Sequence, residues 1–325
     1  MFTPLPNAWY DKSVWPYILL PFSLLFWLIS SIRRWYICRF KQVTAELPVI
    51  VVGNISVGGT GKTPLVVYLC EQLAAAGYRP GVVSRGYGAT APSYPWPVSG
   101  DSKASEVGDE PLLIHRRTGV PVVVGPDRVA AIQSLTNNYD VDVIISDDGL
   151  QHYKMGRQIE IAVVDGQRQL GNGCLLPVGP LRELKSRLRS VNFIVQNGDG
   201  HGIETDFIMT LESADAIAIG NSDSAKVSEL GPLTLTAGIG NPSRFFAAVA
   251  KLGGDVRKEV PLPDHCGLDL AMLEGLKQSE TKLLMTEKDA VKLTAEPAQK
   301  EFWYLPVNGV LSSDLSQAVI KQLKS

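Results

Sequence analysis

A glycine-rich segment between an apolar run and a helical pattern constrains the fold of this chain more than any other feature. Residues 48–53 read PVIVVG, which is typical of a short buried strand in a parallel sheet. The segment GGTGKT follows at residues 58–63, and apolar residues at helical spacing continue from Lys62 to a stop signal at Gly77. A strand, a turn of this composition and a helix together predict a phosphate-binding loop in an α/β protein.

The residues of this loop have distinct expected roles. Glycines let backbone N–H groups turn toward phosphates, while Lys62 is expected to reach the β and γ phosphates and the Thr63 hydroxyl to ligate Mg²⁺. Ser56 stands where the general pattern has its first glycine, a mild departure because the later glycines remain. We therefore predict a nucleotide-binding segment made of Ser56, Val57, Gly58, Gly59, Thr60, Gly61, Lys62 and Thr63.

A second segment supports this prediction. Residues 143–148 read VIISDD, an apolar strand that ends in acids. P-loop enzymes hold Mg²⁺ with an acid at the end of such a strand. Asp-Asp-Gly is also an ordinary turn, but together with the loop it favours Asp147 and Asp148 as metal residues, without deciding which dominates.

The preferred nucleotide is ATP. Guanine-binding members of the P-loop superfamily commonly use Asn-Lys-x-Asp. The nearest segment, TEKD at residues 286–289, has its lysine one place late.

The front of the chain predicts contact with a membrane. Residues 14–32 carry no charge and are about long enough to cross a hydrocarbon core. A basic and aromatic border follows, as on the cytoplasmic side of a membrane helix, with Arg33, Arg34, Trp35, Tyr36, Arg39, Phe40 and Lys41. A cleaved signal peptide would have the reverse order. Pro16 and Pro21 leave a broken segment lying in one leaflet as an alternative, and a buried core helix is the remaining one.

Strands alternate with helices along the rest of the chain, which predicts a doubly wound α/β sheet. Glycines cluster at residues 197–202, and a second α/β pattern follows. The 325 residues are enough for two cores. We expect a membrane anchor with its basic border at 1–44, a P-loop domain at 45–205 and a smaller C-terminal α/β domain at 206–325, whose last helix is free to pack back on the first domain.

Composition excludes some partners and compartments. The net charge of -2 and the pI near 6.1 give no general attraction to nucleic acid, so none is expected as a partner. The cysteines are scattered without metal-ligand spacing and are interpreted as reduced cytosolic thiols.

Several other polar residues are candidates for catalysis or acceptor binding: Asp109, Glu110, Arg128, Gln151, His152, Arg182 and His265. Each also has a structural interpretation. The two acids are able to begin a helix, with Asp127 capping the next. Arg182 is able to join Lys185, Arg187 and Arg189 on a solvated basic face, and either histidine to be structural.

Taken in order, these segments resemble the tetraacyldisaccharide 4'-kinase family. The resemblance is carried by the anchor and by GGTGKTP (58–64), SRGYG (84–88), GDEP (108–111), PDR (126–128), DDGLQH (147–152), LPVGPLR (176–182), PDH (263–265) and TEKDA (286–290). It runs over nearly the whole chain, and the number and order of the motifs make it specific. Leu150 and Cys266 are small departures outside the residues assigned to chemistry.

The resemblance implies a two-domain α/β enzyme on the cytosolic face of the inner membrane of Gram-negative bacteria. Such an enzyme transfers the γ-phosphate of ATP to the 4'-hydroxyl of an acylated disaccharide 1-phosphate, a lipid A precursor, with Mg²⁺ and without an obligate protein partner. It makes Asp109 a candidate base supported by His265, and puts Lys62 and Arg128 near phosphate and Asp147 and Asp148 at the metal. The residues expected at the glycolipid are Glu110, Gln151, His152 and Arg182.

A membrane-bound P-loop ATPase or switch that regulates a protein partner is the alternative. It explains the loop and the anchor equally well. It does not need Asp109 and His265, and its turnover would respond to a protein instead of a glycolipid.

Overall fold

The predicted strand before the glycine-rich loop, β1 (Val49–Gly53), lies at the centre of a nine-stranded sheet. The computed structural model describes residues 4–11, 13–220, 223–264, 266–293 and 301–324. Every β1 residue is buried, and the side chains of alternate residues enter hydrophobic clusters on opposite faces of the sheet. A continuous apolar run is what a strand covered on both faces requires.

The large sheet is parallel except at its two edges. Its order is β15-β8-β7-β6-β1-β5-β2-β4-β3, and only the edge strands β3 and β15 pair antiparallel. The other strands are β2 (Pro80–Ser84), β3 (Trp96–Val98), β4 (Val122–Val124), β5 (Val143–Asp147), β6 (Ile159–Asp165), β7 (Phe193–Asn197), β8 (Phe207–Ser213) and β15 (Val307–Leu311).

The direction of winding reverses at β1. The chain passes from β1 to β2 and β4, returns to β5 between β1 and β2, and then crosses to β6 on the other side of β1. Ligand sites of open α/β sheets form at the carboxyl ends of strands beside such a reversal. The doubly wound fold predicted from the sequence is confirmed.

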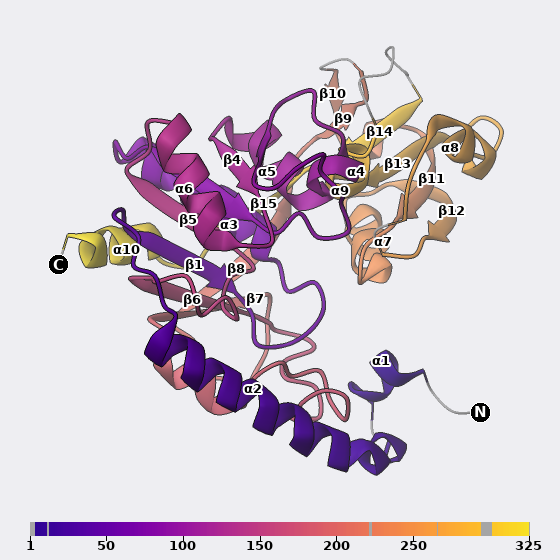
Figure 1. Ribbon diagram of the computed structural model, residues 1–325. Helices are drawn as coiled ribbons and strands as arrows, with labels where there is room; N and C mark the ends of the chain where they lie inside the picture. The colour runs from indigo at the N-terminus through magenta and orange to yellow at the C-terminus, as the bar shows by residue number, and fades with distance from the viewer. Residues whose placement is uncertain (1–3, 12, 221–222, 265, 294–300, 325) are drawn as a thin grey trace.

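Helices cover both faces of this sheet (Figure 1). Residues of α3 (Lys62–Ala75), α5 (Asp109–Thr118) and α10 (Leu315–Leu323) share one hydrophobic cluster, with the short α4 (Ala104–Val107) leading into α5. Residues of α6 (Arg128–Asn138) and of the 3-10 helix η2 (Lys185–Ser190) belong to the cluster on the other face.

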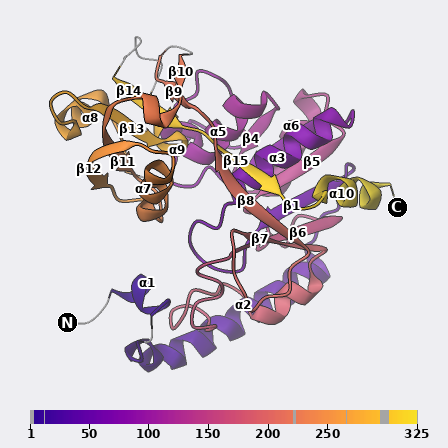
Figure 2. The same cartoon turned by 180° about the vertical axis from the view of Figure 1, so that it is seen from behind.

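A second sheet of six strands is separate from the large one (Figure 2). Two further hydrophobic clusters pack against it. Its order is β10-β9-β14-β13-β11-β12. It is built from β9 (Ala216–Ala218), β10 (Ser224–Ala225), η3 (Val227–Glu229), β11 (Pro232–Ala237), α7 (Pro242–Lys251), β12 (Asp255–Pro261), α8 (Leu270–Leu276), β13 (Lys282–Thr286), α9 (Glu287–Ala290) and β14 (Phe302–Leu305).

Sheet membership differs from the predicted division at residue 206. Strand β8 continues the large sheet beyond β7, and β15 returns from the second sheet to pair with β8, after which α10 packs against α3. Strand β8 needs a partner on its outer side, and the only segment that supplies one comes from the far end of the described chain. The boundary itself stays a prediction.

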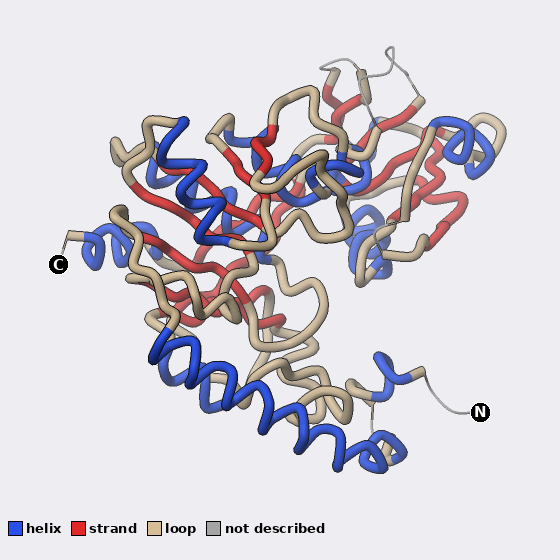
Figure 3. Tube along the Cα trace, viewed as in Figure 1, coloured by secondary structure: helices blue, strands red, loops and turns tan. Residues whose placement is uncertain are grey.

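The N-terminal segment lies along one side of the large sheet (Figures 1 and 3). It consists of α1 (Leu5–Ala8), the 3-10 helix η1 (Trp15–Leu19) and α2 (Leu20–Phe40). The stretch Trp15–Phe40 is long and apolar enough to cross a membrane, and only 11% of its most apolar part is buried. The alternative of a buried core helix is therefore wrong. A few contacts fix α2 to the body, among them the 2.8 Å hydrogen bond from Ser23 Oγ to the Leu175 carbonyl.

Candidate active site

The glycine-rich loop has the backbone that its sequence predicts. Gly61 precedes α3 with φ of 90°, and Gly58 has φ of 108°, both in the left-handed region that favours glycine. A Cβ on Gly61 would lie 2.3 Å from the Nδ2 atom of Asn197. The same Nδ2 donates a 3.0 Å hydrogen bond to the Thr60 carbonyl and so supports the loop from β7. Gly58 and Gly59 are exposed, which leaves their backbone open to a ligand.

The segment before the loop pairs with a distant one. Val57 N donates to the Pro180 carbonyl at 2.9 Å, and Arg182 N donates to the Ile55 carbonyl at 2.7 Å. Ser56 is buried and forms an isolated bridge with Leu181. This pairing brings the LPVGPLR segment to the loop and explains how a residue more than a hundred positions away reaches the site.

Asp148 lies between two cations. Its Oδ1 is 3.6 Å from Lys62 Nζ, and its Oδ2 is 3.3 Å from an Arg182 Nη atom. Burial raises the pKa of the Asp148 carboxyl, but the charges of Lys62 and Arg182 outweigh burial and hold the pKa below its usual value. The residue has φ of 47°, so the turn after β5 adopts a left-handed conformation.

Asp147 has the opposite surroundings. Its side chain is buried, and its Oδ2 accepts a 3.0 Å hydrogen bond from Ser84 Oγ. Burial, and then the negative charges of Glu110 and Asp148, raise the pKa of Asp147 to about 7. Its Oδ1 has no hydrogen-bond partner among the described residues.

These two carboxylates fit Mg²⁺. A buried carboxylate oxygen without a partner at the end of β5 offers a ligand to a hard cation. Mg²⁺ in nucleotide sites is commonly held by one or two carboxylates, phosphate oxygens and water. Within the described residues, no group of three or more His, Cys, Asp or Glu side chains is gathered as a metal site.

Arg128 is buried beside Asp147. One of its Nη atoms donates to the Gly125 carbonyl at 2.6 Å and the other to the Asp147 carbonyl at 3.3 Å. Burial lowers the pKa of Arg128 to about 10, so the guanidinium is still charged at neutral pH. Asp127 caps α6, as its structural interpretation expected, by accepting a 3.0 Å hydrogen bond from Val129 N.

Asp109 and Glu110 begin α5, and each contacts a lysine that lies in or just after α9, the helix that follows β13 of the second sheet. Lys288 Nζ is 3.1 Å from Glu110 Oε1, and Lys292 Nζ is 3.7 Å from Asp109 Oδ2. Burial raises the pKa of Glu110, but the charges of Lys288 and Lys62 outweigh burial and lower the pKa overall. The N-cap position of α5 is Gly108, so the Asp109 carboxylate is not in the capping position.

The proposed partner of Asp109 lies outside the described residues. His265 is not among them. Its neighbour Cys266 accepts a 3.0 Å hydrogen bond at its carbonyl from Lys292 Nζ. Lys292 therefore contacts both Asp109 and the segment that carries the PDH motif.

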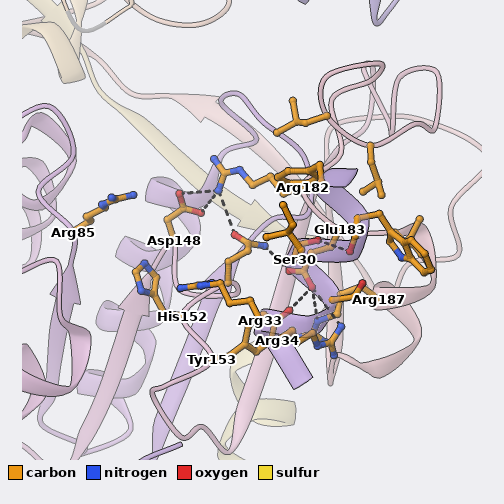
Figure 4. A pocket seen from close by; sticks show the side chains of 18 of the residues that line it. Ser30, Arg33, Arg34, Arg85, Asp148, His152, Tyr153, Arg182, Glu183 and Arg187 are labelled. Carbon is orange, nitrogen blue, oxygen red and sulfur yellow. Dashed lines mark hydrogen bonds and ion pairs between the residues drawn. The ribbon is translucent and has the colours of Figure 1, made fainter. Parts of the chain in front are cut away.

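A cavity of about 620 Å³ extends from Asp147 and Asp148 to the exposed apolar helix α2. At one end lie Asp147, Asp148, Glu110, Arg128 and Arg182. At the other end α2 contributes Phe26, Trp27, Ile29, Arg33 and Arg34. Gln151 and His152, both predicted for the acceptor, also line it, and Figure 4 shows His152 beside Asp148. The cavity therefore connects a cluster of charged side chains with the exposed apolar surface of α2.

Glu183 is a site residue that sequence reasoning missed. Its Oε1 accepts a 2.7 Å hydrogen bond from Gln151, and its Oε2 accepts one from the Tyr153 hydroxyl. Gln151 in turn accepts a 3.3 Å hydrogen bond from Arg182 (Figure 4). The one available signal was its position next to Arg182 in the LPVGPLR segment.

The solvated basic face suggested for this segment is wrong for Arg187. Its side chain is 3% exposed and pairs with Glu160 at 2.5 Å and with Glu183 at 3.6 Å. Burial lowers the pKa of Arg187, but its bonds to Glu160 outweigh burial and raise it overall. These two ion pairs compensate for the water that the guanidinium loses on burial.

A P-loop at the reversal point of a parallel sheet, together with a carboxylate pair that lines a cavity, defines a nucleotide-dependent phosphotransferase of the P-loop class. A family model described as tetraacyldisaccharide-1-P 4'-kinase matches residues 15–324. The chain belongs to the tetraacyldisaccharide 4'-kinase family.

The alignments with individual relatives span almost the whole of this chain and of each relative. The tetraacyldisaccharide 4'-kinase of Shewanella frigidimarina is 50% identical over 320 residues, which are 98% of this chain and 94% of the relative. That of Vibrio cholerae serotype O1 is 48% identical over 313 residues, or 96% and 92%. The crystal structure of LpxK from Aquifex aeolicus in complex with ATP matches with a TM-score of 0.79 and 25% identity, covering 95% of this chain and all of that one.

Proposed function

We propose that this chain transfers the γ-phosphate of ATP to the 4'-hydroxyl of a tetraacyldisaccharide 1-phosphate at the cytoplasmic face of the inner membrane. The observation that carries this proposal is the cavity, which joins the acids at the end of β5, Asp147 and Asp148, to the apolar surface of α2. An acceptor whose acyl chains stay in the bilayer is able to present its sugar to such a cavity. Neither nucleic acid nor an obligate protein partner is required.

The loop and the acid pair hold the nucleotide and the metal. Lys62 and the backbone of residues 56–61 cradle the phosphates, and Thr63 with Asp147 and Asp148 provides oxygen ligands. MgATP supplies the phosphoryl group and, through the metal, neutralises part of its charge. The Lys62 and Arg182 contacts keep Asp148 ionised before any ligand binds.

Asp109 accepts the proton of the 4'-hydroxyl. A sugar hydroxyl is a weak nucleophile at neutral pH, so a carboxylate that takes its proton during transfer lowers the barrier. The side chain is 11% exposed, which limits competition from water. His265 supports this carboxylate. Arg128 contributes positive charge beside the acid pair.

The acceptor sugar is held by residues that line the cavity. The Gln151 amide is fixed by Glu183 and by the Asn54 carbonyl at 3.0 Å, so its position is set before the acceptor arrives. Burial, and then the charges of Arg128 and Arg85, lower the pKa of His152 to about 4, so its imidazole is neutral at pH 7. Glu110 and Arg182 complete this set.

The experiment measures transfer of label from [γ-³²P]ATP to purified glycolipid in detergent micelles. Asp109→Asn is expected to lower the initial velocity roughly a hundredfold, because an amide does not accept the proton, with little change in ATP binding or thermal stability. Asp127→Asn is the matched control: it makes the same change at a carboxylate that does cap a helix, and asparagine caps equally well.

Two results would count against these assignments. Near-normal velocity in Asp109→Asn would move the base to Asp147, Asp148 or Glu110. ATP hydrolysis that responds to a protein partner and leaves the glycolipid unlabelled would favour the ATPase or switch.

A further inference from the structure

Two adjacent arginines of α2 enter the cavity at the end away from the P-loop. Arg33 and Arg34 both line it, and Figure 4 shows them near Tyr153, while Asp148 and Arg182 lie at the other end. Arg34 is 42% exposed, stacks 4.9 Å above the Tyr153 ring and is 3.5 Å from Glu183. Arg33 is exposed and forms no ion pair or hydrogen bond with any part of the chain that the structure describes.

The acids at this end of the cavity are too few to neutralise its arginines. Glu183 pairs with Arg34 at 3.5 Å, but it also pairs with Arg187 at 3.6 Å. Arg187 is paired with Glu160, which also binds Arg157. An uncompensated positive charge therefore remains where the cavity meets the apolar face of α2.

The acceptor of the family carries a charged group in addition to its hydroxyl. Its description includes a 1-phosphate, and the 1-position lies at the opposite end of a disaccharide from the 4'-hydroxyl. If the hydroxyl lies at the acid end, the phosphate points toward α2. An arginine fork matches phosphate oxygens with two parallel hydrogen bonds, so it gives both charge and orientation.

We propose that Arg33 and Arg34 bind the 1-phosphate of the acceptor and select it over an acceptor that lacks this group. The proposal rests on the proposed function. The sugar then spans the cavity from Arg33 to Asp148, while the acyl chains lie along Phe26, Trp27 and Ile29. Binding at both ends fixes which hydroxyl faces the site of transfer.

Phospholipid headgroups carry the same phosphate chemistry and lie at the same membrane depth. The two sources differ in where the arginines act. A substrate phosphate makes the arginines matter for one acceptor only, whereas headgroup binding makes them matter for every acceptor presented in an anionic bilayer.

The test compares two acceptors, the tetraacyldisaccharide 1-phosphate and the same disaccharide without its phosphate, in micelles of neutral detergent. The parent enzyme is expected to prefer the phosphorylated acceptor roughly tenfold to a hundredfold in kcat/KM, the size of one or two charge-assisted hydrogen bonds. Arg33→Gln is expected to lose most of this preference, mainly through a higher KM for the phosphorylated acceptor. Its velocity on the other acceptor is expected to change little.

Arg39→Gln is the matched control. It removes the same charge from the same helix, outside the cavity, where Arg39 lies 5.5 Å above the Phe40 ring. Arg34→Gln is the second variant, and it is expected to act in the same direction as Arg33→Gln. A thermal melt of each variant verifies folding.

The outcomes separate this proposal from the proposed function. Equal effects of Arg33→Gln on both acceptors, or an effect seen only in vesicles that contain anionic phospholipid, would overturn the phosphate assignment and leave the kinase assignment intact. A parent enzyme that labels neither acceptor would overturn the proposed function instead.

Discussion

Single residues in this site have protonation states set by their surroundings and not by their type. Asp147 and Asp148 are neighbours in sequence, yet burial raises the pKa of the first while Lys62 and Arg182 outweigh burial and lower the pKa of the second. The Asp147 carboxyl is thus partly protonated at neutral pH, whereas the Asp148 carboxylate stays ionised between two cations. Neighbouring groups with pKa values shifted in opposite directions are typical of functional sites.

His152 gives a measurable consequence at the residue scale. Burial, with Arg128 and Arg85 and against Asp148, lowers its pKa from 6.5 to about 4. An unfolded chain binds the proton more readily, so this residue's contribution to stability is complete above pH 6.5 and is lost as pH falls toward 4. We expect His152→Gln to lose less stability than the parent over that interval.

The measurement is the urea midpoint of each protein between pH 7.5 and pH 4.5, without ligands. His201→Gln, at an exposed loop position, is the control for loss of an imidazole. Parallel pH profiles for the parent and His152→Gln would show that the folded protein does not hold this histidine neutral.

At the scale of elements, the contact between α5 and α9 joins the two sheets at the site. Two lysines in and after α9 reach the two acids that begin α5, and Arg117 at the other end of α5 pairs with Glu287 at 3.0 Å. Lys292 also binds the fully buried Asp289 at 2.8 Å. The Lys292 ammonium group is therefore held in place by a carboxylate that is shielded from solvent.

We expect Lys292→Met to lower kcat about tenfold while leaving ATP binding unchanged, because Asp109 loses the cation that positions it. The informative measurement is a double-mutant cycle with Asp109→Asn. Once the carboxylate is an amide, removal of the lysine is expected to cost little further activity. Losses that simply multiply would assign Lys292 to folding alone.

Arg117→Met is the matched control for this cycle. It removes an ion pair between the same two elements without touching Asp109. If Lys292→Met fails to fold because Asp289 is left unpaired, Lys292→Gln keeps a donor for Asp289 and tests the same charge.

The parts of this site that the sequence predicted are those whose residues lie close together along the chain. The loop from Ser56 to Thr63 and the acids after β5 are local motifs at strand ends, and the structure places them together. Arg182 was a candidate, but its route to the loop is backbone pairing across a long separation. Glu183 and Lys292 were missed because their partners lie in other elements and no local pattern marks them.

At the scale of the whole molecule, the second unit reaches the P-loop directly. A Cβ on Gly240, ahead of α7, would lie 3.8 Å from Gly59 N, and Arg168 Nη2 donates to the Gly240 carbonyl at 3.2 Å. Arg244 of α7 binds Asn197 at 3.1 Å, and Asn197 supports the loop. The P-loop therefore borders both sheets, while the cavity opens toward α2.

The position of α2 changes what removal of the anchor would test. Phe26, Trp27 and Ile29 line the cavity, so deletion of the helix removes part of the cavity wall as well as any membrane contact. Leu24 and Leu28 are 63% and 49% exposed and do not line it. Substitution of these two leucines separates the two roles.

We expect Leu24→Gln with Leu28→Gln to weaken binding to phospholipid vesicles, because roughly 1.5–3 kcal/mol of transfer free energy is lost for each leucine that would be buried in lipid. Velocity on acceptor in detergent micelles is expected to stay near that of the parent, since the cavity is unchanged. Vesicle flotation and initial velocity are measured on the same preparation. Leu252→Gln, at a 40% exposed leucine far along the chain, is the control for loss of surface hydrophobicity. Undiminished flotation of the double variant would mean that α2 does not hold the protein on the membrane, and the surface around the cavity mouth would have to do so instead.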